Sequence, residues 1–256
     1  MRRRAPDRCA GIRSSFSYER AVRAQQALRS RVTFSWPGNH VLERGVIAVD
    51  ASYWGAGESY GIAVAIALGP SGRALTCYEA YGPVCVPYIP GLLAFREAQL
   101  MVPALRAAVR AMGASVVLVD GHGIAHPRRF GIASHLGVVL SIPSIGVAKG
   151  LLYGSLAPCP LGTCIEAEGE VLGAALEVSG RRIYVSPGNM VDVAKAVEVV
   201  KSMLREGVRL PYPLADADRI SKLERKRLSG TRPDILNVGP CDEAIELALS
   251  GGGQKA

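Results

Sequence analysis

Three acidic residues in this sequence stand where their carboxylates could share one metal ion. Asp50 and Asp120 each end an apolar run, VIAV and VVLV, and Glu97 lies between them in a stretch with helical character. Carboxylates at strand ends can converge at the edge of a sheet without burying an unpaired charge. Such groups repel one another unless a cation neutralises them, and hard oxygen ligands suit Mg²⁺, with Mn²⁺ as a substitute. On a basic protein this pattern indicates phosphodiester hydrolysis, although each acid taken alone is more often a surface charge.

A second candidate for chemistry is the stretch VVLVDGHGIAHPRRFGIASHLGVVL, residues 116–140, in which histidines, arginines and glycines follow an apolar strand. Glycine leaves the backbone bare, which permits a ligand or another segment to come close. The histidines can serve a site there, or they can be satisfied core or capping groups. The bare backbone beside Asp120 therefore predicts that something approaches it closely.

The elements that must position these residues follow from the apolar patterns. Three strands joined by short glycine turns predict an antiparallel meander, and the later strands alternate with helices. In chain order the patterns predict a helix over 17–32, strands ending near Asp50, Gly69 and Gly82, a helix over 87–113 bent near Pro103, a strand over 115–120, a helix over 132–140, a strand over 145–150, a hairpin over 173–189, and helices over 191–207 and 213–227. This order predicts one α/β domain with a mixed sheet.

Length, charge and apolar content bound the class of protein. The 256 residues, 49% of them hydrophobic, suit a single folded domain, and the net charge of +8 favours an anionic partner such as nucleic acid. The basic N-terminal stretch lacks the apolar segment of a signal peptide, and the longest apolar run, GIAVAIALG, is too short to cross a bilayer. We therefore expect a cytoplasmic protein without membrane contact.

Six cysteines are present, and none belongs to a CxxC motif. The spacing predicts no zinc site, and in a cytosolic protein it favours reduced thiols that behave as small buried hydrophobic residues. A disulfide between Cys159 and Cys164, which bracket PLGT, is the alternative.

Taken together, the motifs resemble the endonuclease V family of inosine-directed repair nucleases. PYIPGLLAFRE, LVDGHGIAHPRRFGIASHLG and IGVAKG follow VDASY in that order, and the resemblance covers roughly residues 17–228. It implies a ribonuclease H-like mixed β-sheet flanked by helices. It also implies Mg²⁺-dependent hydrolysis of the second phosphodiester bond 3′ to a deoxyinosine in DNA, leaving 3′-hydroxyl and 5′-phosphate ends. Residues 1–16 are then a flexible basic arm, and residues 229–256 a partly disordered extension with one short helix.

The resemblance also assigns roles in the reaction. It implies that Asp50, Glu97 and Asp120 hold the metal and that Lys149 is the active-site lysine. A fourth active-site acid aligns at Asp218, and Asp216, two residues away, is the less favoured alternative. Side chains two positions apart on a helix point in different directions, so only one of these two aspartates can reach the metal.

Recognition of the base is implied for a further set of residues. Tyr88, held between two prolines in PYIP, would be a wedge that replaces a base flipped from the stack. His126, Arg128, Arg129 and His135 would bind phosphate and support the pocket. The pocket itself would be lined by Gly91, Leu93, Gly121, Gly123, Gly131 and Leu152. An ordinary turn tyrosine and ordinary core leucines are the alternatives. Leu214 and Ala215 stand where relatives often have a threonine–arginine pair, so a phosphate contact there is absent or supplied by Arg219; separately, Asn189 stands where many relatives have a histidine.

Two other functions remain open at this stage. An inosine-specific endoribonuclease with the same fold would differ only in having space for a 2′-hydroxyl near the strand that is cut. A non-catalytic lesion-binding protein is disfavoured because all three core carboxylates are present. In each case the partner is nucleic acid containing inosine, double- or single-stranded, and we expect a monomer.

Overall fold

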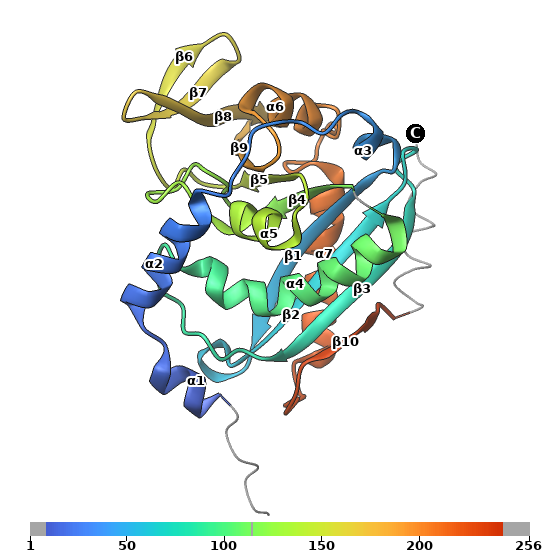
Figure 1. The fold of residues 1–256 in the computed structure, drawn as a ribbon. Helices are drawn as coiled ribbons and strands as arrows, with labels where there is room; N and C mark the ends of the chain where they lie inside the picture. Colours follow the sequence, from blue (N-terminus) through green and yellow to red (C-terminus); the bar gives the residue numbers. More distant parts are fainter. Residues whose placement is uncertain (1–8, 114, 243–256) are drawn as a thin grey trace, which may run out of the picture.

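The computed structural model describes residues 9–113 and 115–242, and its centre is a ten-stranded mixed sheet (Figure 1). The strand order is β10-β3-β2-β1-β4-β5-β9-β8-β7-β6. The strands are β1 (Val46–Trp54), β2 (Tyr60–Leu68), β3 (Ala74–Pro83), β4 (Val116–Asp120), β5 (Ser144–Ala148), β6 (Ser155–Cys159), β7 (Gly162–Ala167), β8 (Glu170–Val178), β9 (Arg181–Asn189) and β10 (Asn237–Pro240). Only the neighbours β1, β4 and β5 run parallel, so their C-terminal ends meet at one edge.

Helices cover both faces of this sheet. They are α1 (Ala10–Ser15), α2 (Tyr18–Arg29), α3 (His40–Glu43), α4 (Leu93–Met112), α5 (Ile132–Leu140), α6 (Val193–Lys201) and α7 (Tyr212–Leu228), with a short 3₁₀ turn η1 (Ala56–Glu58). Alternate residues of β1 divide between two cores: Ile47 and Val49 pack with α4 and α5, whereas Val46 and Ala48 pack with α6 and α7. Successive side chains of β1 therefore point alternately toward α4 and toward α7. In Figure 1, α4 lies in front of the sheet and α7 behind it.

The predicted elements are present, with four differences. The first strand continues to Trp54, four residues past Asp50, and the helix over 87–113 begins only at Leu93 but passes Pro103 without ending. The helix predicted over 191–207 ends at Lys201. The hairpin of β6 and β7 was not predicted, because its short strands are mostly half-buried and their sequences lack the apolar alternation that marks a strand. The single mixed α/β domain is confirmed.

The segments outside the predicted catalytic domain are more ordered than expected. Within the predicted flexible arm, residues 10–15 form α1. In the extension, residues 237–240 form β10, which pairs with β3, where a helix was expected; any helix after residue 242 lies outside the described residues. Both terminal segments thus contribute to the folded domain, and β10 extends its sheet.

The cysteines correct the expectation of reduced thiols. Disulfides join Cys9 to Cys85, Cys77 to Cys241, and Cys159 to Cys164. The first two tie the N-terminal segment and the β10 segment to the body of the domain, because their partners lie far away in sequence. Among the helices that the structure describes, none combines the length and apolar character needed to cross a membrane.

Candidate active site

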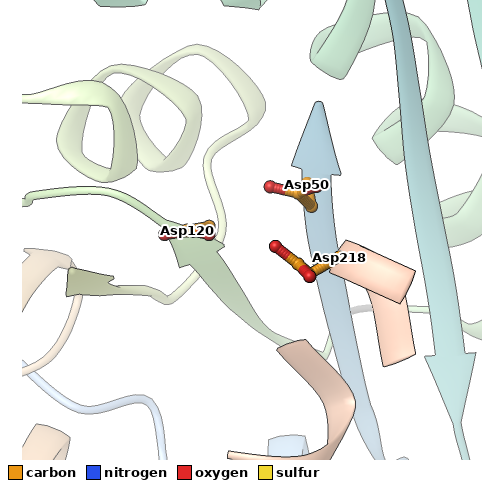
Figure 2. Close-up of side chains that lie close together, drawn as sticks. All are labelled: Asp50, Asp120 and Asp218. Atoms are coloured by element: carbon orange, nitrogen blue, oxygen red, sulfur yellow. The ribbon is translucent and has the colours of Figure 1, made fainter. Parts of the chain in front are cut away.

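Three aspartates gather where β1, β4 and α7 meet (Figure 2). Asp50 lies on β1, Asp120 ends β4, and Asp218 is on α7; one carboxylate oxygen of each lies within 4.8 Å of the others. The register places Asp50 beside Asp120, because Val49 pairs with Val119 in the parallel ladder. Asp218, predicted as the fourth acid, therefore belongs to the same group as Asp50 and Asp120. Asp216 instead forms an ion pair with Arg219, with its Oδ1 3.2 Å from Arg219 Nη2.

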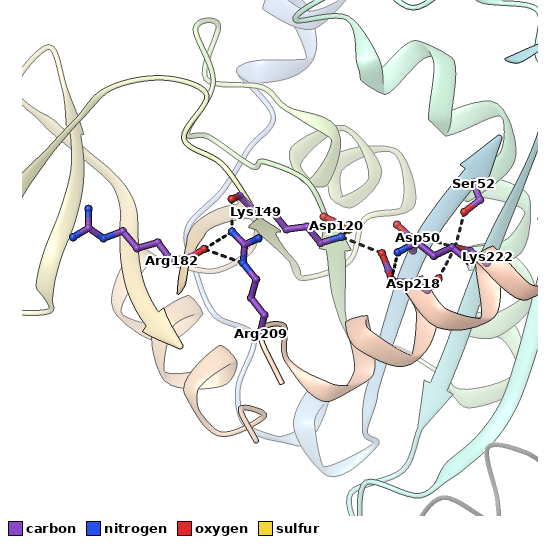
Figure 3. Close-up of polar contacts among 9 residues, drawn as sticks. Asp50, Ser52, Asp120, Lys149, Arg182, Arg209, Asp218 and Lys222 are labelled. Atoms are coloured by element: carbon purple, nitrogen blue, oxygen red, sulfur yellow. Dashed lines mark hydrogen bonds and ion pairs between the residues drawn. The ribbon is translucent and has the colours of Figure 1, made fainter. Parts of the chain in front are cut away.

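Hydrogen bonds and ion pairs hold these carboxylates in place (Figure 3). The Lys149 ammonium, at the end of β5, donates to Asp120 Oδ2 at 2.7 Å and to Asp218 Oδ1 at 3.0 Å. Lys222 donates to the other Asp218 oxygen at 2.6 Å, and the buried Ser221 hydroxyl donates to Asp50 at 2.5 Å. Asp218, Ser221 and Lys222 reach the cluster together because residues three and four apart share one face of a helix. Arg209 donates to the Lys149 carbonyl at 2.6 Å and fixes the backbone that carries the ammonium.

The surroundings change the acidity of each group. Burial raises the pKa of Asp50 to about 6, against the opposing hydrogen bond from Ser221, and the charges of Asp120 and Asp218 raise it further. Burial acts on Asp218 in the same direction, but the hydrogen bonds from Lys222 and Lys149 outweigh it and lower the pKa of Asp218. Burial lowers the pKa of Lys149, yet its two carboxylate partners reverse that effect and raise it. Lys149 is therefore a cation held between two anions.

Glu97 comes from α4, which lies on the other face of the sheet. It is not one of the three acids within 4.8 Å, although it was predicted as a metal ligand with Asp50 and Asp120. Its side chain is buried and lies near the Tyr53 hydroxyl, which lowers the pKa of Glu97, although neither Glu97 Oε2 nor that hydroxyl makes a hydrogen bond of good geometry among the described residues. Burial, with the charges of Asp50 and Asp120, raises the pKa of Glu97 to about 8. These charges show that Glu97 is within electrostatic reach of the cluster.

These donors fit a hard divalent cation. Asp50 and Glu97 both have a raised pKa, chiefly because they are buried and also because neighbouring carboxylates add negative charge. A buried carboxylate oxygen without a partner is costly unless something satisfies it. Oxygen-only donors are those that Mg²⁺ and Mn²⁺ prefer. Asp50, Asp120 and Asp218 are the residues placed to hold such an ion, with Glu97 beside them.

A cavity of about 180 Å³ lies next to Asp120, and most of the predicted base-pocket residues line it. Its lining includes the predicted residues Tyr88, Gly91, Leu93, Gly121, His126, Gly131 and Leu152. Tyr88 is 63% exposed, as a wedge residue must be, and Leu152 is 49% exposed. Gly121 directly follows Asp120 in the chain, so the wall of the cavity is continuous with the carboxylate cluster.

The cavity wall is fixed by hydrogen bonds that converge on the Gly91 carbonyl. Gln25 Nε2 donates to it at 3.0 Å and Arg128 Nη2 at 2.5 Å, and His126 Nε2 lies 3.2 Å away. Gly91 has φ +77°, and a Cβ there would lie 2.7 Å from the Arg128 guanidinium, so glycine is required. His126 Nδ1 accepts from the Arg128 amide, which leaves Nε2 as the donor to Gly91 in a neutral ring. Burial and the charge of Arg128 lower the pKa of His126 to about 4, in agreement with that assignment.

Gln25 is a cavity residue that the sequence did not reveal. It lies on α2, is fully buried, and also donates to the Phe130 carbonyl at 3.1 Å while accepting from Arg128 Nε at 2.6 Å. Helical spacing in 17–32 predicted a buried face from the apolar residues alone, and a single glutamine carries no such signal. Ser221 and Lys222 could have been found from Asp218, because they follow it by three and four residues.

Four residues predicted for recognition do not line the cavity: Gly123, Arg128, Arg129 and His135. Of these, Arg128 supports the wall through its hydrogen bond to the Gly91 carbonyl. A Cβ on Gly123 would lie 1.8 Å from the Pro187 carbonyl oxygen, so this glycine permits close packing against β9. Arg129 pairs with Glu168 and Glu170, each at 3.2 Å. His135 is buried against the rings of Phe95 and Phe130, and burial lowers its pKa to about 4. A neutral, buried histidine and an arginine already paired with two acids are poorly suited to bind phosphate.

The mixed sheet with its group of acids where β1 and β4 meet α7 defines a nuclease of the ribonuclease H-like fold with a candidate metal site. The Endonuclease V family model matches residues 26–219, and the chain belongs to the endonuclease V family. Endonuclease V from Aeropyrum pernix is 44% identical over 94% of this chain and 96% of its own length. That from Desulfurococcus amylolyticus is 41% identical over 81% of this chain and 95% of its own.

Solved structures agree with this assignment. Endonuclease V from Streptomyces avermitilis superposes with a TM-score of 0.71 at 33% identity, covering 83% of this chain and 95% of that one. Endonuclease V from Ciona intestinalis, a D234N variant in complex with a 23mer DNA containing an inosine followed by a ribo-adenosine, superposes with a TM-score of 0.67 at 25% identity. That match covers 83% of this chain and the whole of the other.

Proposed function

We propose that this protein is a Mg²⁺-dependent DNA repair endonuclease that recognises deoxyinosine and hydrolyses the second phosphodiester bond 3′ to it, leaving 3′-hydroxyl and 5′-phosphate ends. The observation that carries the proposal is the cavity lined by Tyr88, Gly91, Gly121 and Leu152, whose wall runs directly into Asp120. A base held in that cavity brings its own strand to the carboxylates.

Selection of inosine rests on the cavity wall. Flipping a base costs a few kcal/mol of stacking and pairing, and this cost is lowest for a poorly paired base such as hypoxanthine. Tyr88 is exposed and lies at the cavity, where its ring can take the place of the departed base. Gly91, Gly121 and Gly131 present backbone instead of side chains to the base. A tight wall of this kind rejects guanine, because it offers the 2-amino group neither room nor a partner.

Cleavage rests on the carboxylates and Lys149. A divalent cation held by Asp50, Asp120 and Asp218, with Glu97 beside them, supplies charge neutralisation at the phosphate and a nucleophile at neutral pH. Ser221 orients Asp50, and Lys222 orients Asp218, so both carboxylates are fixed before substrate arrives. The Lys149 ammonium lies between Asp120 and Asp218, from which it can donate to a phosphate oxygen. Mn²⁺ meets the same ligand requirements as Mg²⁺.

RNA is the second candidate substrate. The Ciona intestinalis protein was solved with a strand in which a ribo-adenosine follows the inosine. A ribose at that position is therefore compatible with binding in a protein of the same fold. We further propose that the enzyme acts as a monomer, because one chain supplies both the cavity and the carboxylates.

A cleavage assay separates these functions. Matched duplexes with one central inosine, in DNA and in RNA, are incubated with Mg²⁺ or with EDTA, and the cut is mapped from the length and end chemistry of the products. We expect Mg²⁺-dependent nicking of DNA one nucleotide past the inosine, with a 5′-phosphate on the downstream fragment. Asp120→Ala removes a carboxylate from the cluster and should abolish the cut.

Each other outcome has a definite meaning. Cutting of RNA alone would mean that the enzyme acts in RNA turnover and uses the same active site. Equal cutting of duplexes with and without inosine contradicts the role of the cavity in recognition. Binding without cutting in Mg²⁺ contradicts the nuclease proposal and leaves a lesion-binding protein.

A further inference from the structure

A second hollow adjoins the carboxylates on the side of α7, and none of the roles proposed so far uses it. This α7 groove, of about 730 Å³, is lined by Trp54, Asp218, Lys222, Leu223, Arg225 and Lys226, among others. It shares Asp218 with the carboxylate cluster. The base cavity adjoins the same cluster at Asp120, through Gly121. The cluster therefore has a hollow next to each of two neighbouring aspartates.

The charge of the α7 groove is positive. Lys222 lies four residues after Asp218, and Arg225 and Lys226 lie three and four residues after Lys222, so these side chains lie along one side of α7. Lys222 is neutralised in part by Asp218, at 2.6 Å. Arg225 and Lys226 are exposed, and within the part of the chain that the structure describes neither forms an ion pair. Two unpaired cations thus face a hollow whose lining includes a single acid, Asp218.

The apolar part of the α7 groove comes from Trp54 and Leu223. Trp54 is held rigidly, because its ring stacks on Tyr60 at 5.8 Å and its indole N–H donates to the Thr231 carbonyl at 3.1 Å. Leu223 is 49% exposed. Apolar and aromatic surface beside cations is the combination that binds a nucleic-acid strand, with bases or sugars on the one and phosphates on the other.

We infer that the α7 groove binds the nucleotides immediately 3′ to the cleaved bond. The inference rests on the proposed function, which places the inosine in the base cavity and the cut on its 3′ side. A nucleic-acid strand whose inosine occupies that cavity runs past Asp120 and the carboxylate cluster. Its 3′ part then lies on the side of Asp218, where Lys222 contacts Asp218 in Figure 3. The first downstream phosphates then meet Lys222, Arg225 and Lys226.

The test compares inosine substrates that differ only downstream of the cut. One ends directly after the first nucleotide past the cleaved bond, and the other extends about ten nucleotides further, within the range covered by single-strand binding sites. The double variant Arg225→Glu, Lys226→Glu is compared with the wild type. Arg106→Glu, Arg110→Glu on α4 is the matched control, because these exposed arginines lie on the opposite side of the sheet and the change in net charge is the same.

In the wild type, we expect the longer substrate to have a KM at least tenfold lower. The double variant on α7 should lose most of that gain, and the slope of log affinity against log salt should fall by about one to two, at ~0.7 per phosphate contact in a single strand. The α4 control should keep the gain. The inference is overturned if the wild type gains nothing from downstream length, if the α7 variant keeps the gain, or if the α4 control loses as much.

A binding measurement separates this inference from the proposed function. A 5′-phosphorylated oligonucleotide without inosine is labelled at its 3′ end and titrated with each protein, with fluorescence anisotropy as the readout. Weaker binding to the α7 variant alone supports the groove even if no inosine substrate is cut. Equal binding by all three proteins, together with normal cleavage, overturns the groove and leaves the proposed function standing.

Discussion

Ser221 on α7 donates a 2.5 Å hydrogen bond to the Asp50 carboxylate on β1, so helix and strand are joined at the carboxylate cluster itself. The Ser221 hydroxyl also lies 2.9 Å from that of Ser52. Asp50 is buried beside two other acids, and this hydrogen bond opposes the rise of its pKa. A residue outside the acidic group thus keeps one of its members ionised.

Ser221→Ala should lower cleavage at neutral pH about tenfold to a hundredfold, since a hydrogen bond to a charged group contributes about 1.5–3 kcal/mol. The acid limb of the pH–rate profile should move to higher pH, because the pKa of Asp50 rises further. Ser202→Ala, which removes a hydroxyl bonded only to the Val199 carbonyl at the end of α6, is the control. An acid limb that does not move would show that Ser221 acts on stability alone.

Asp218 and Asp216 offer a matched pair, two residues apart on one helix. Asp218→Asn should weaken Mg²⁺ binding at least tenfold, because it removes one of the three converging carboxylates. Asp216→Asn should leave binding unchanged, since Asp216 pairs with Arg219. The measurement is the rise in unfolding temperature as Mg²⁺ is titrated, which needs no substrate. Equal shifts in both variants would remove Asp218 from the metal site.

Without metal, the buried acids make stability depend on pH in an unusual direction. The folded state keeps a proton on Glu97 up to about pH 8, whereas the unfolded chain releases it near 4.5. The folded state therefore binds more protons than the unfolded state between these values, and the free energy of unfolding falls as the pH rises. His126 and His135 oppose this only at lower pH, because burial holds them neutral.

In EDTA, the unfolding temperature should therefore fall from about pH 6.5 to about pH 8.5, and Glu97→Gln should reduce that fall. The comparison with Glu97→Gln is needed because burial also raises the pKa of Glu79 to about 7. Added Mg²⁺ should stabilise the wild type more at the higher pH, where the ligands are ionised. The same slope in the wild type and in Glu97→Gln would place the titration elsewhere.

The disulfide between Cys77 and Cys241 closes a loop of 164 residues, and that between Cys159 and Cys164 a loop of 5. Constraint of the unfolded chain grows with the loop, so Cys77→Ala, Cys241→Ala should cost about 2–5 kcal/mol, or roughly 5–15 °C in unfolding temperature. Cys159→Ala, Cys164→Ala should cost clearly less. Scanning calorimetry of both variants is the test, and the reverse order would contradict it.

A structural feature could be predicted from the sequence only where its residues follow a recognisable pattern. Asp50 and Asp120 could be predicted to meet because each follows an apolar strand. The β6–β7 hairpin could not, because its short, mostly half-buried strands show no apolar alternation. The oxidation state of the cysteines was also beyond reach, since Cys77 and Cys241 are brought together only by β10, a strand of four residues. Arg129 and His135 look in sequence like their neighbours His126 and Arg128, and only the fold turns them away from the cavity.

Gln25 is the residue for which the structure adds most. Its amide and carbonyl satisfy Gly91, Phe130 and Arg128 at once, so it joins α2 to both walls of the base cavity. Gln25→Ala removes the Gln25 partner from the Phe130 carbonyl and from Arg128 Nε, at about 1–3 kcal/mol each where no water replaces it, whereas the Gly91 carbonyl keeps Arg128 and His126.

We expect Gln25→Ala to raise KM for an inosine substrate about tenfold or more and to reduce discrimination against guanine, because Arg128 and the Gly91 backbone are held less firmly. Gln26→Ala is the control, because Gln26 is exposed on the same helix. Both kinetic constants are measured on inosine and guanine substrates, beside the unfolding temperature of each variant. A merely structural role would lower the unfolding temperature of Gln25→Ala and leave the ratio of kcat/KM between inosine and guanine unchanged. A fall in that ratio, with normal ratios in Gln26→Ala, would make Gln25 a positioning residue for base recognition.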